Sequence, residues 1–347
     1  MKFTDILGKI WGDPLGFFSL IYILCIGFIA IFSSYLAPDN SENANYMHVS
    51  IHSKPPGFST TLLLIPSEEG NFREEIPIRD YAWKANALHY TPYGRAQGYQ
   101  QSIRIDDFPK NLTKEEITQQ FIVKRTFWWG TDKFGRDLLS RMLFGTRISF
   151  FIGFIAVFIS LVVGIFFGGI AGYMGGKVDQ FILWLINIMW SIPSLLMVIV
   201  ITLALGKGYW QVFIAVGLTM WVDIARLVRG QVISIKTHTH VEAARVLGFS
   251  PLPLFFNHIF PLIIPALIVI STANFASAIL IESGLSFLGI GAQPPVPSWG
   301  GMIKDHFRYI LLGKPYLAII PGIAIMSLVL AFMLLGNSLR DALDVKD

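Results

Sequence analysis

The chain has 347 residues, of which 53% are hydrophobic and only 14% are charged. Soluble domains carry about 25% charged residues, so this composition excludes an ordinary water-soluble globule and predicts a membrane protein. The formal net charge of +4 at pH 7 is attributed to loop topology rather than to nucleic-acid binding. Because Cys25 is the single cysteine, a disulfide framework and thiolate metal or redox chemistry are also excluded.

The first apolar run covers residues 17–36, between Asp13 and Asp39, and follows a terminal segment of residues 1–16. A run of this length crosses a hydrocarbon core of about 30 Å as a helix. No small-residue cleavage site follows it, so we expect a retained first transmembrane helix rather than a cleaved signal peptide.

Residues 37–127 have a different character, with frequent charges, prolines and scattered aromatic residues. Short β-type runs at residues 60–65 and 120–123 indicate a small α/β or partly β module outside the membrane. No motif in this insertion reveals its function.

Further uncharged stretches follow this insertion, at residues 148–176, 180–206, 208–222, 259–281 and 315–339. With the first run they predict an all-α polytopic membrane protein with six transmembrane helices, of which residues 128–337 contain the last five. Short-loop lysines and arginines are concentrated on the side of the termini, so we expect both termini, including residues 338–347, in the cytoplasm. The insertion of residues 37–127 is then expected on the extracytoplasmic side of the membrane.

Three details of these stretches carry structural expectations. Gly164, Gly168 and Gly172 are four residues apart, so they share one helix face and allow another helix to approach closely. Pro193 is expected to kink its helix. The short 208–222 stretch is extended toward Arg226, whose side chain we expect to reach the interface and to pair with Asp223.

The cytoplasmic loop of residues 229–258 contains a short helix with defined ends. Thr239 and Glu242 have the spacing of a capping box, and Gly248 can adopt the left-handed conformation that ends a helix. Ser250 and Pro251 then begin a second helix. We interpret this corner as a docking surface for a partner, with an ordinary connecting loop as the alternative.

The corner resembles the EAA loop of ABC importer permeases through Glu242, Ala243, Ala244 and Gly248, although His258 and Phe260 depart from its later positions. Two further segments narrow the resemblance to the C-type permease subunit of dipeptide and oligopeptide importers. They are WGTDKFGRDLLSR at residues 129–141 and ESGLSFLGIGAQPPVPSWG at residues 282–300. The insertion is longer than is usual in that family, so the chain resembles a long-loop variant.

The resemblance implies a type I ABC importer permease (MetI-like) fold in a bacterial inner membrane. It further implies a homologous B-type permease partner, two ABC ATPase subunits that bind ATP and Mg, and an extracytoplasmic substrate-binding protein. The chain itself would be a non-catalytic subunit that binds no cofactor and contacts lipid. Its substrate would be a di- or oligopeptide, with nickel chelates or modified peptides as alternatives.

Site residues fall into three groups. ATPase coupling is assigned to Thr239, Glu242, Ala243, Ala244 and Gly248. Positioning of the second span, in preference to substrate contact, is assigned to Gly130, Thr131, Asp132, Gly135, Arg136, Asp137 and Arg141. We expect Asp132, Arg136, Asp137 and Arg141 to form a charge-rich outward helix with an Asp137–Arg141 pair. Glu282, Ser283 and Ser286 either line the translocation pathway or satisfy backbone amides at a helix break.

Other functions are disfavoured by missing motifs. The chain has no phosphate-binding G-x-x-x-x-G-K-[ST] loop, no H-E-x-x-H and no G-x-S-x-G, and we expect no metal site at His238, His240 and His258. A secondary transporter or channel would need ionisable residues at mid-bilayer, and the long uncharged stretches offer almost none. A structural scaffold would leave the cytoplasmic corner without a purpose.

Overall fold

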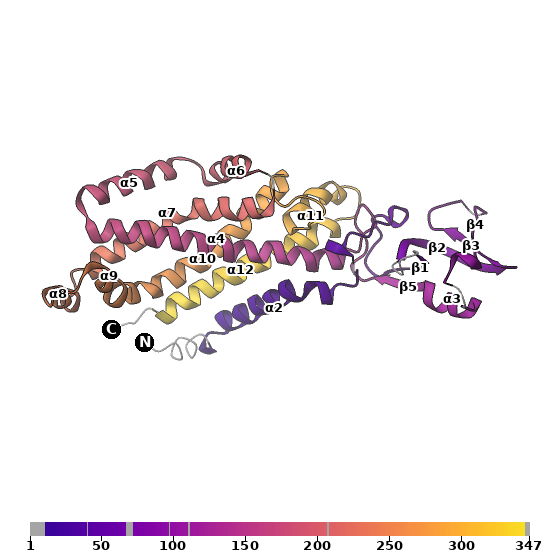
Figure 1. Ribbon diagram of the computed structural model, residues 1–347, viewed down its shortest axis with the longest axis horizontal. Helices are drawn as coiled ribbons and strands as arrows, with labels where there is room; N and C mark the ends of the chain where they lie inside the picture. Colours follow the sequence, from indigo (N-terminus) through magenta and orange to yellow (C-terminus); the bar gives the residue numbers. More distant parts are fainter. Residues whose placement is uncertain are drawn as a thin grey trace. The chain divides into compact units, whose positions relative to one another are not determined.

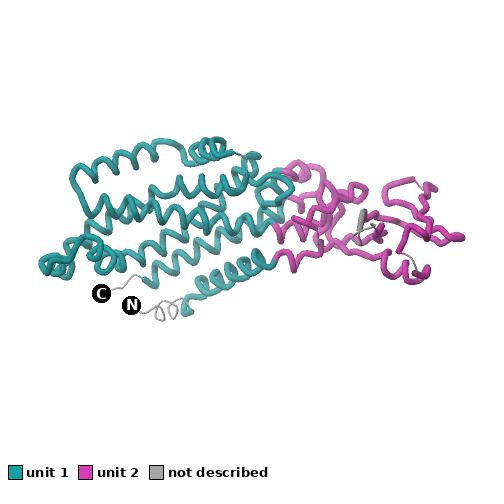
Figure 2. Tube along the Cα trace, viewed as in Figure 1, with its two compact units in different colours: residues 1–32, 145–304, 319–347 teal, residues 33–144, 305–318 magenta. Residues whose placement is uncertain are grey.

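The computed structural model describes residues 11–39, 41–66, 72–96, 98–109, 112–206 and 208–343. The chain forms two compact units, shown in different colours in Figure 2. The helical unit consists of residues 1–32, 145–304 and 319–347, and the mixed unit of residues 33–144 and 305–318. Each unit is described separately below.

Five helices are long and apolar enough to cross a membrane. They are α2 (Pro14–Leu36), α4 (Leu138–Met174), α7 (Tyr209–Ile235), the continuous segment Pro251–Leu288 that ends in α10 (Phe260–Leu288), and α12 (Tyr316–Leu343). Within the helical unit α4, α7, α10 and α12 run alongside one another (Figure 1). Helices satisfy every backbone hydrogen bond internally, which is what a hydrocarbon environment requires.

A sixth span is formed by a bent pair, α5 (Gly176–Ser191) and α6 (Ser194–Leu205), whose axes differ by 94°. The break lies at Pro193, which has no N–H group to donate to the preceding turn. Ile192, the residue before the proline, is extended with φ −99° and ψ 127°. The expected kink is therefore a complete break, and the six predicted spans agree with the structure when the pair counts as one span.

Close contact between α4 and α7 depends on the predicted glycine stripe. A Cβ atom added at Gly168 would lie 2.4 Å from the carbonyl oxygen of Ala225, and one at Gly164 would lie 2.6 Å from the Cβ of Ile224. At Gly172 the nearest atom would be the Cβ of Val232, at 2.7 Å. The expectation of close helix approach at this stripe is confirmed.

The mixed unit contains an antiparallel sheet with strand order β4-β3-β2-β1-β5. The strands are β1 (Phe58–Pro66), β2 (Phe72–Lys84), β3 (Ala87–Pro92), β4 (Gln101–Arg104) and β5 (Ile122–Phe127). Helix α3 (Lys114–Phe121) packs Ile117 and Phe121 into one core with Leu62 and Leu88 of the sheet. The partly β insertion is thus confirmed, although the second predicted run begins at Ile122, because Gln120 still belongs to α3.

The remaining short elements are 3-10 turns at Glu42–Ala44, Val49–Ile51, Ile105–Asp107 and Phe307–Ile310, together with α8 (Thr239–Val246), α9 (Pro251–Leu254), a π-helix (Phe255–Ile259) and α11 (Trp299–His306). The π-helix leads directly from α9 into α10.

The Gly168→Ala variant tests the contact between α4 and α7. Its Cβ atom meets backbone rather than a movable side chain, so the two helices must separate. Overpacking of this kind costs about 1–3 kcal/mol, and we expect the unfolding temperature of the purified protein to fall by about 5 °C.

Gly230→Ala is the matched control, because Gly230 lies in α7 with nothing within 4 Å of the added Cβ. Replacing an interior helical glycine by alanine stabilises a helix by about 1 kcal/mol, so this variant should unfold at the same or a higher temperature. Equal shifts in the two variants would contradict the close-contact interpretation.

Candidate functional site

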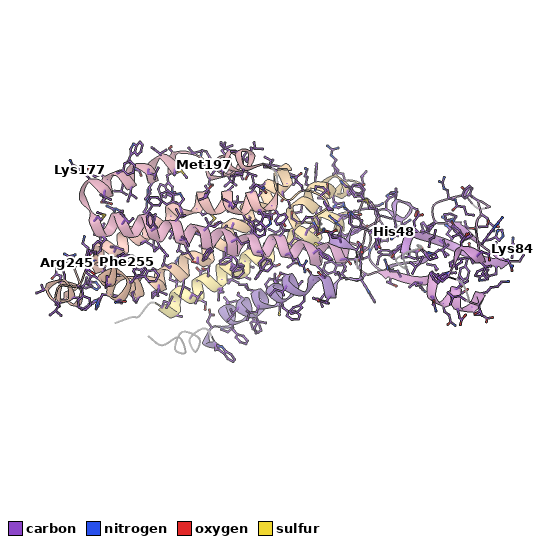
Figure 3. All side chains as sticks on the ribbon, in the orientation of Figure 1. His48, Lys84, Lys177, Met197, Arg245 and Phe255 are labelled. Atoms are coloured by element: carbon purple, nitrogen blue, oxygen red, sulfur yellow. The ribbon has the colours of Figure 1, made fainter. Side chains whose placement is uncertain are left out.

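The corner between α7 and α10 carries the strongest sequence signal, and the structure shows two short helices there. Gly248, between α8 and α9, has φ +87°, which is the predicted left-handed conformation. Arg245 and Phe255 mark this end of the helical unit in Figure 3. Val241 and Ala244 of α8 are buried in one apolar cluster with Leu254 and other residues of the segment that follows.

The opposite face of α8 is open. Glu242 and Ala243 are exposed, and two apolar side chains at the end of the helix, Val246 and Leu247, are 87% and 78% exposed. Large exposed apolar side chains beside a small residue are suited to a protein interface. The four residues of the EAA-type motif therefore differ in exposure. Ala244 faces the core, whereas Glu242, Ala243 and Gly248 are exposed.

The predicted capping box is wrong. The N-cap residue is His238, and Thr239 is already the first residue of α8. The amide of Glu242 donates to the carbonyl oxygen of His238 at 3.1 Å, and no side chain caps the helix. Thr239 lies one position too late to serve as an N-cap. Ser250 does occupy the N-cap position of α9, also without a side-chain hydrogen bond.

The segment of residues 130–137 is a tight loop, and the predicted outward helix is wrong here. Thr131 and Asp137 form an isolated β-bridge, and α4 begins only at Leu138. Asp132 organises the loop, since its Oδ1 accepts hydrogen bonds from the amides of Phe134 at 2.8 Å and Arg136 at 3.0 Å. These hydrogen bonds from the backbone to the Asp132 side chain stabilise the loop conformation instead of a helix.

Two glycines permit this loop. Gly135 has φ +76°, and a Cβ atom there would lie 1.8 Å from the carbonyl oxygen of His48. Gly130 has φ +80°, and its Cβ atom would lie 2.3 Å from the carbonyl oxygen of Lys54. Both positions therefore require glycine for conformation and for space.

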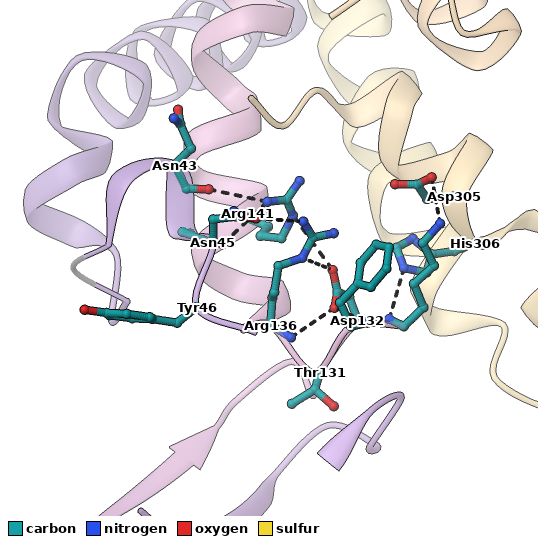
Figure 4. Close-up of polar contacts among 12 residues, drawn as sticks. Asn43, Asn45, Tyr46, Thr131, Asp132, Arg136, Arg141, Asp305 and His306 are labelled. Atoms are coloured by element: carbon teal, nitrogen blue, oxygen red, sulfur yellow. Dashed lines mark hydrogen bonds and ion pairs between the residues drawn. The ribbon is translucent and has the colours of Figure 1, made fainter. Parts of the chain in front are cut away.

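A buried charge cluster surrounds Asp132 (Figure 4). Asp132 is 0% exposed, and its Oδ2 accepts from Nε of Arg136 at 2.6 Å, while Nε of Arg141 lies 3.9 Å away. The same guanidinium groups reach the preceding segment, because Arg136 donates to Oδ1 of Asn45 at 2.9 Å and Arg141 donates to the carbonyl oxygen of Asn43 at 3.4 Å. The cluster fastens residues 43–45 to the start of α4.

Asp137 has a different role from the one predicted. It forms no ion pair with Arg141 among the described residues, and its Oδ2 accepts instead from the amide of Ser140 at 2.9 Å. This is the position of a helix-capping carboxylate at the start of α4. Burial raises the pKa of Asp137, and the hydrogen bonds from Ser140 oppose that shift.

The third group, Glu282, Ser283 and Ser286, is brought together by α10 inside the helical unit. Glu282 is 1% exposed, and Oγ of Ser286 donates to its Oε1 at 2.6 Å. Ser286 in turn accepts from the amide of Ala292 at 3.2 Å and from Oγ of Ser298 at 3.1 Å. This chain of hydrogen bonds holds the loop after α10 against the helix, and all three side chains are enclosed in this conformation.

The position and the partner of one polar residue, Asp223, differ from the prediction. Asp223 lies near the middle of α7, not at its end, because the helix continues to Ile235. The predicted pair with Arg226 is absent among the described residues, since Nε1 of Trp190 donates to Oδ1 of Asp223 at 3.2 Å and Arg226 lies 3.5 Å from the Trp190 ring centroid. The contact of Trp190 with both side chains is a tertiary feature that helix spacing does not reveal.

Comparisons with known proteins identify a family and several relatives. Residues 164–346 match the family described as binding-protein-dependent transport system inner membrane component. The dipeptide transport system permease protein DppC of Bacillus subtilis (strain 168) is 37% identical over 239 residues, which are 69% of this chain and 75% of that protein. The oligopeptide transport system permease protein OppC of the same organism is 39% identical over 63% of this chain and 72% of that protein.

A third relative, the glutathione transport system permease protein GsiD of Pectobacterium atrosepticum, is 39% identical over 63% of this chain and 72% of that protein. A solved structure of the MetNI methionine ABC transporter aligns with a TM-score of 0.48 and 18% identity, covering 57% of this chain and 94% of that chain.

The Asp132→Asn variant tests the buried charge cluster. It leaves two buried guanidinium groups without the carboxylate that both face, and breaking a buried ion pair costs about 3–5 kcal/mol. We expect thermal unfolding at a clearly lower temperature, together with faster proteolytic cleavage within residues 33–144.

The Lys133→Met variant removes the neighbouring ion pair of Lys133 with Asp305, at 2.9 Å, which is partly exposed. Exposed pairs contribute about 0–1 kcal/mol, so this control should behave almost like the wild type. An Asp132→Asn variant as stable as the Lys133→Met variant would refute the structural role of the cluster.

Proposed function

Since this chain belongs to the binding-protein-dependent transport system inner membrane component family, we propose that it is a permease subunit of an ATP-driven importer of di- or oligopeptides. Two features support the proposal: substantial identity to dipeptide and oligopeptide permeases over most of their length, and the open face of α8. The exposed face of α8 is the basis of the proposed coupling mechanism, because it offers a surface on which an ATPase subunit can bind.

The proposed coupling begins at the exposed face of α8. Glu242 and Ala243, with Val246 and Leu247, dock on an ABC ATPase, and the small Ala243 side chain lets the two surfaces approach closely. The buried face fixes α8 to its own subunit through Val241 and Ala244. A displacement of the ATPase is therefore passed to the permease and is not absorbed by a loose loop.

The displacement then reaches the membrane-spanning helices through one apolar cluster. This cluster joins Val228 and Val232 of α7 to Ile263 and Leu267 of α10. Packed interiors shift as units between alternative arrangements rather than deforming gradually. In the proposed cycle α7 and α10 move together with α8, and this movement opens the pathway alternately to the two sides of the membrane.

We further propose the partners and the orientation that this cycle requires. The chain pairs with a homologous B-type permease, and two ATPase subunits bind ATP and Mg, so this subunit is itself non-catalytic. A substrate-binding protein delivers the peptide. The protein lies in a bacterial inner membrane with both termini and α8 in the cytoplasm, and the mixed unit lies on the opposite side, where the buried charge cluster positions the start of α4.

The Glu242→Lys variant tests the coupling surface. Charge reversal at an exposed docking residue leaves the fold intact but opposes contact with the ATPase, so we expect peptide uptake by the complete transporter in vesicles to fall by about tenfold or more. Peptide-stimulated ATP hydrolysis should fall in parallel.

Lys177→Glu provides a matched charge reversal at an exposed residue in the first turn of α5 (Figure 3). It should leave uptake unchanged, because Lys177 lies outside α8. If the Glu242→Lys transporter retained normal uptake and normal ATPase stimulation with both ATPases bound, the coupling proposal would fail.

A further inference from the structure

An exposed carboxylate lies near the middle of a membrane-spanning helix. Asp223 belongs to α7 (Tyr209–Ile235), and its side chain is open to the surroundings of the subunit. Among the described residues its one hydrogen bond comes from Nε1 of Trp190, at 3.2 Å, and it forms no ion pair. This leaves Oδ2 of the carboxylate available.

Such a group is costly in lipid. An aspartate at the centre of a spanning helix costs about 2.5–3.5 kcal/mol even on the most lenient scale, and such residues face a bundle interior or an aqueous cavity. An exposed Asp223 on the isolated subunit therefore points to a polar space in the assembled transporter rather than to acyl chains.

A cavity of about 320 Å³ adjoins the carboxylate. It lies at the break between α5 and α6, and its walls include Trp190, Pro193, Ser194 and Thr219 together with Asp223. Because the helix is interrupted here, the carbonyl end of α5 and the amide end of α6 both adjoin the cavity, with partial negative and partial positive charge respectively. Interrupted helices of this kind bind charged ligands in several transporter folds.

Arg226 contacts the ring of Trp190 but is not among the residues that line the cavity. The guanidinium carbon of Arg226 lies 3.5 Å from the Trp190 ring centroid, as expected for a cation–π contact. This contact holds Arg226 at the ring face, with no salt bridge to Asp223 among the described residues. Among the residues that line the cavity Asp223 has the one ionisable side chain, and Ser194 and Thr219 add hydroxyl groups, so the cavity favours a cationic ligand.

We propose that Asp223 binds the N-terminal ammonium group of the transported peptide as it passes through the membrane. Every peptide with a free amino terminus carries this group, so one carboxylate serves many sequences. A charge-assisted hydrogen bond to the carboxylate supplies the attraction. Thr219 and Ser194, whose hydroxyl oxygens can accept hydrogen bonds, line the same cavity. The inference rests on the proposed peptide importer and assigns one of its substrate contacts.

A thiol placed in the cavity tests this inference. Cys25 is the single cysteine, so the Cys25→Ser background makes the Thr219→Cys variant the only thiol in this chain. In the complete transporter, assembled with cysteine-free partner subunits in vesicles, we expect a neutral hydrophilic methanethiosulfonate to modify it. The Ile224→Cys variant is the control, because Ile224 is 0% exposed and its thiol should stay unmodified.

Peptide protection then identifies the ligand group. Trialanine should slow modification of the Thr219→Cys variant, whereas propionyl-dialanine, which has the same length but no ammonium group, should not. Adding Asp223→Asn should weaken protection by trialanine about tenfold, as expected for a lost charge-assisted hydrogen bond. Asp223→Glu should restore it, which excludes a general folding defect.

Several outcomes would overturn the inference. An unmodified Thr219→Cys variant would mean that the cavity is closed to water, and equal protection by both peptides would exclude ammonium recognition. Loss of the partner permease from the purified Asp223→Asn complex would show an interfacial ion pair instead. Uptake of trialanine by the wild-type transporter is measured separately, so a failure of peptide import is distinguished from a failure of this site.

Discussion

The backbone contact between α4 and α7 is the constraint on which the helical unit depends. Three glycines on α4 remove the side chains that would separate the two helices, and α7 lies directly against the bare backbone. This contact fixes the rotation of α7. As a result Ile224 is buried, whereas the residue before it, Asp223, is exposed. α7 carries the proposed substrate contact, and the proposed coupling helix α8 follows directly after its end.

Three buried carboxylates lie close to a helix end, and each satisfies different polar groups. Asp137 receives the free amide at the start of α4, and Glu282 with Ser286 holds the chain after α10 leaves helical geometry. Asp132 pairs with Arg136 and lies 3.9 Å from Nε of Arg141, and these two guanidinium groups anchor the segment before α4. An unsatisfied polar group costs free energy both in hydrocarbon and in packed protein, so these hydrogen bonds and ion pairs stabilise the fold.

The sequence predicted features that depend on local chemistry. Apolar length located the spans, Pro193 located the break, and Gly248 located the left-handed corner. It failed where partners come from elsewhere in the chain. The charges of residues 132–141 suggested a helix, but Asp132 bonds to loop amides, and helix spacing suggested an Asp223–Arg226 pair, but Trp190 lies between these groups. Tertiary partners, which no local pattern reveals, decided both cases.

The two alanines of the coupling corner illustrate a division of labour within one turn of helix. Ala243 is exposed, whereas Ala244 is buried against the apolar cluster of α7 and α10. Under the proposed coupling, enlarging the first side chain would leave a properly folded subunit with weaker binding to the ATPase. Enlarging the second would disturb the subunit before any motor arrives. The same residue type at adjacent positions therefore meets two different environments, an open surface at Ala243 and the packed interior of the subunit at Ala244.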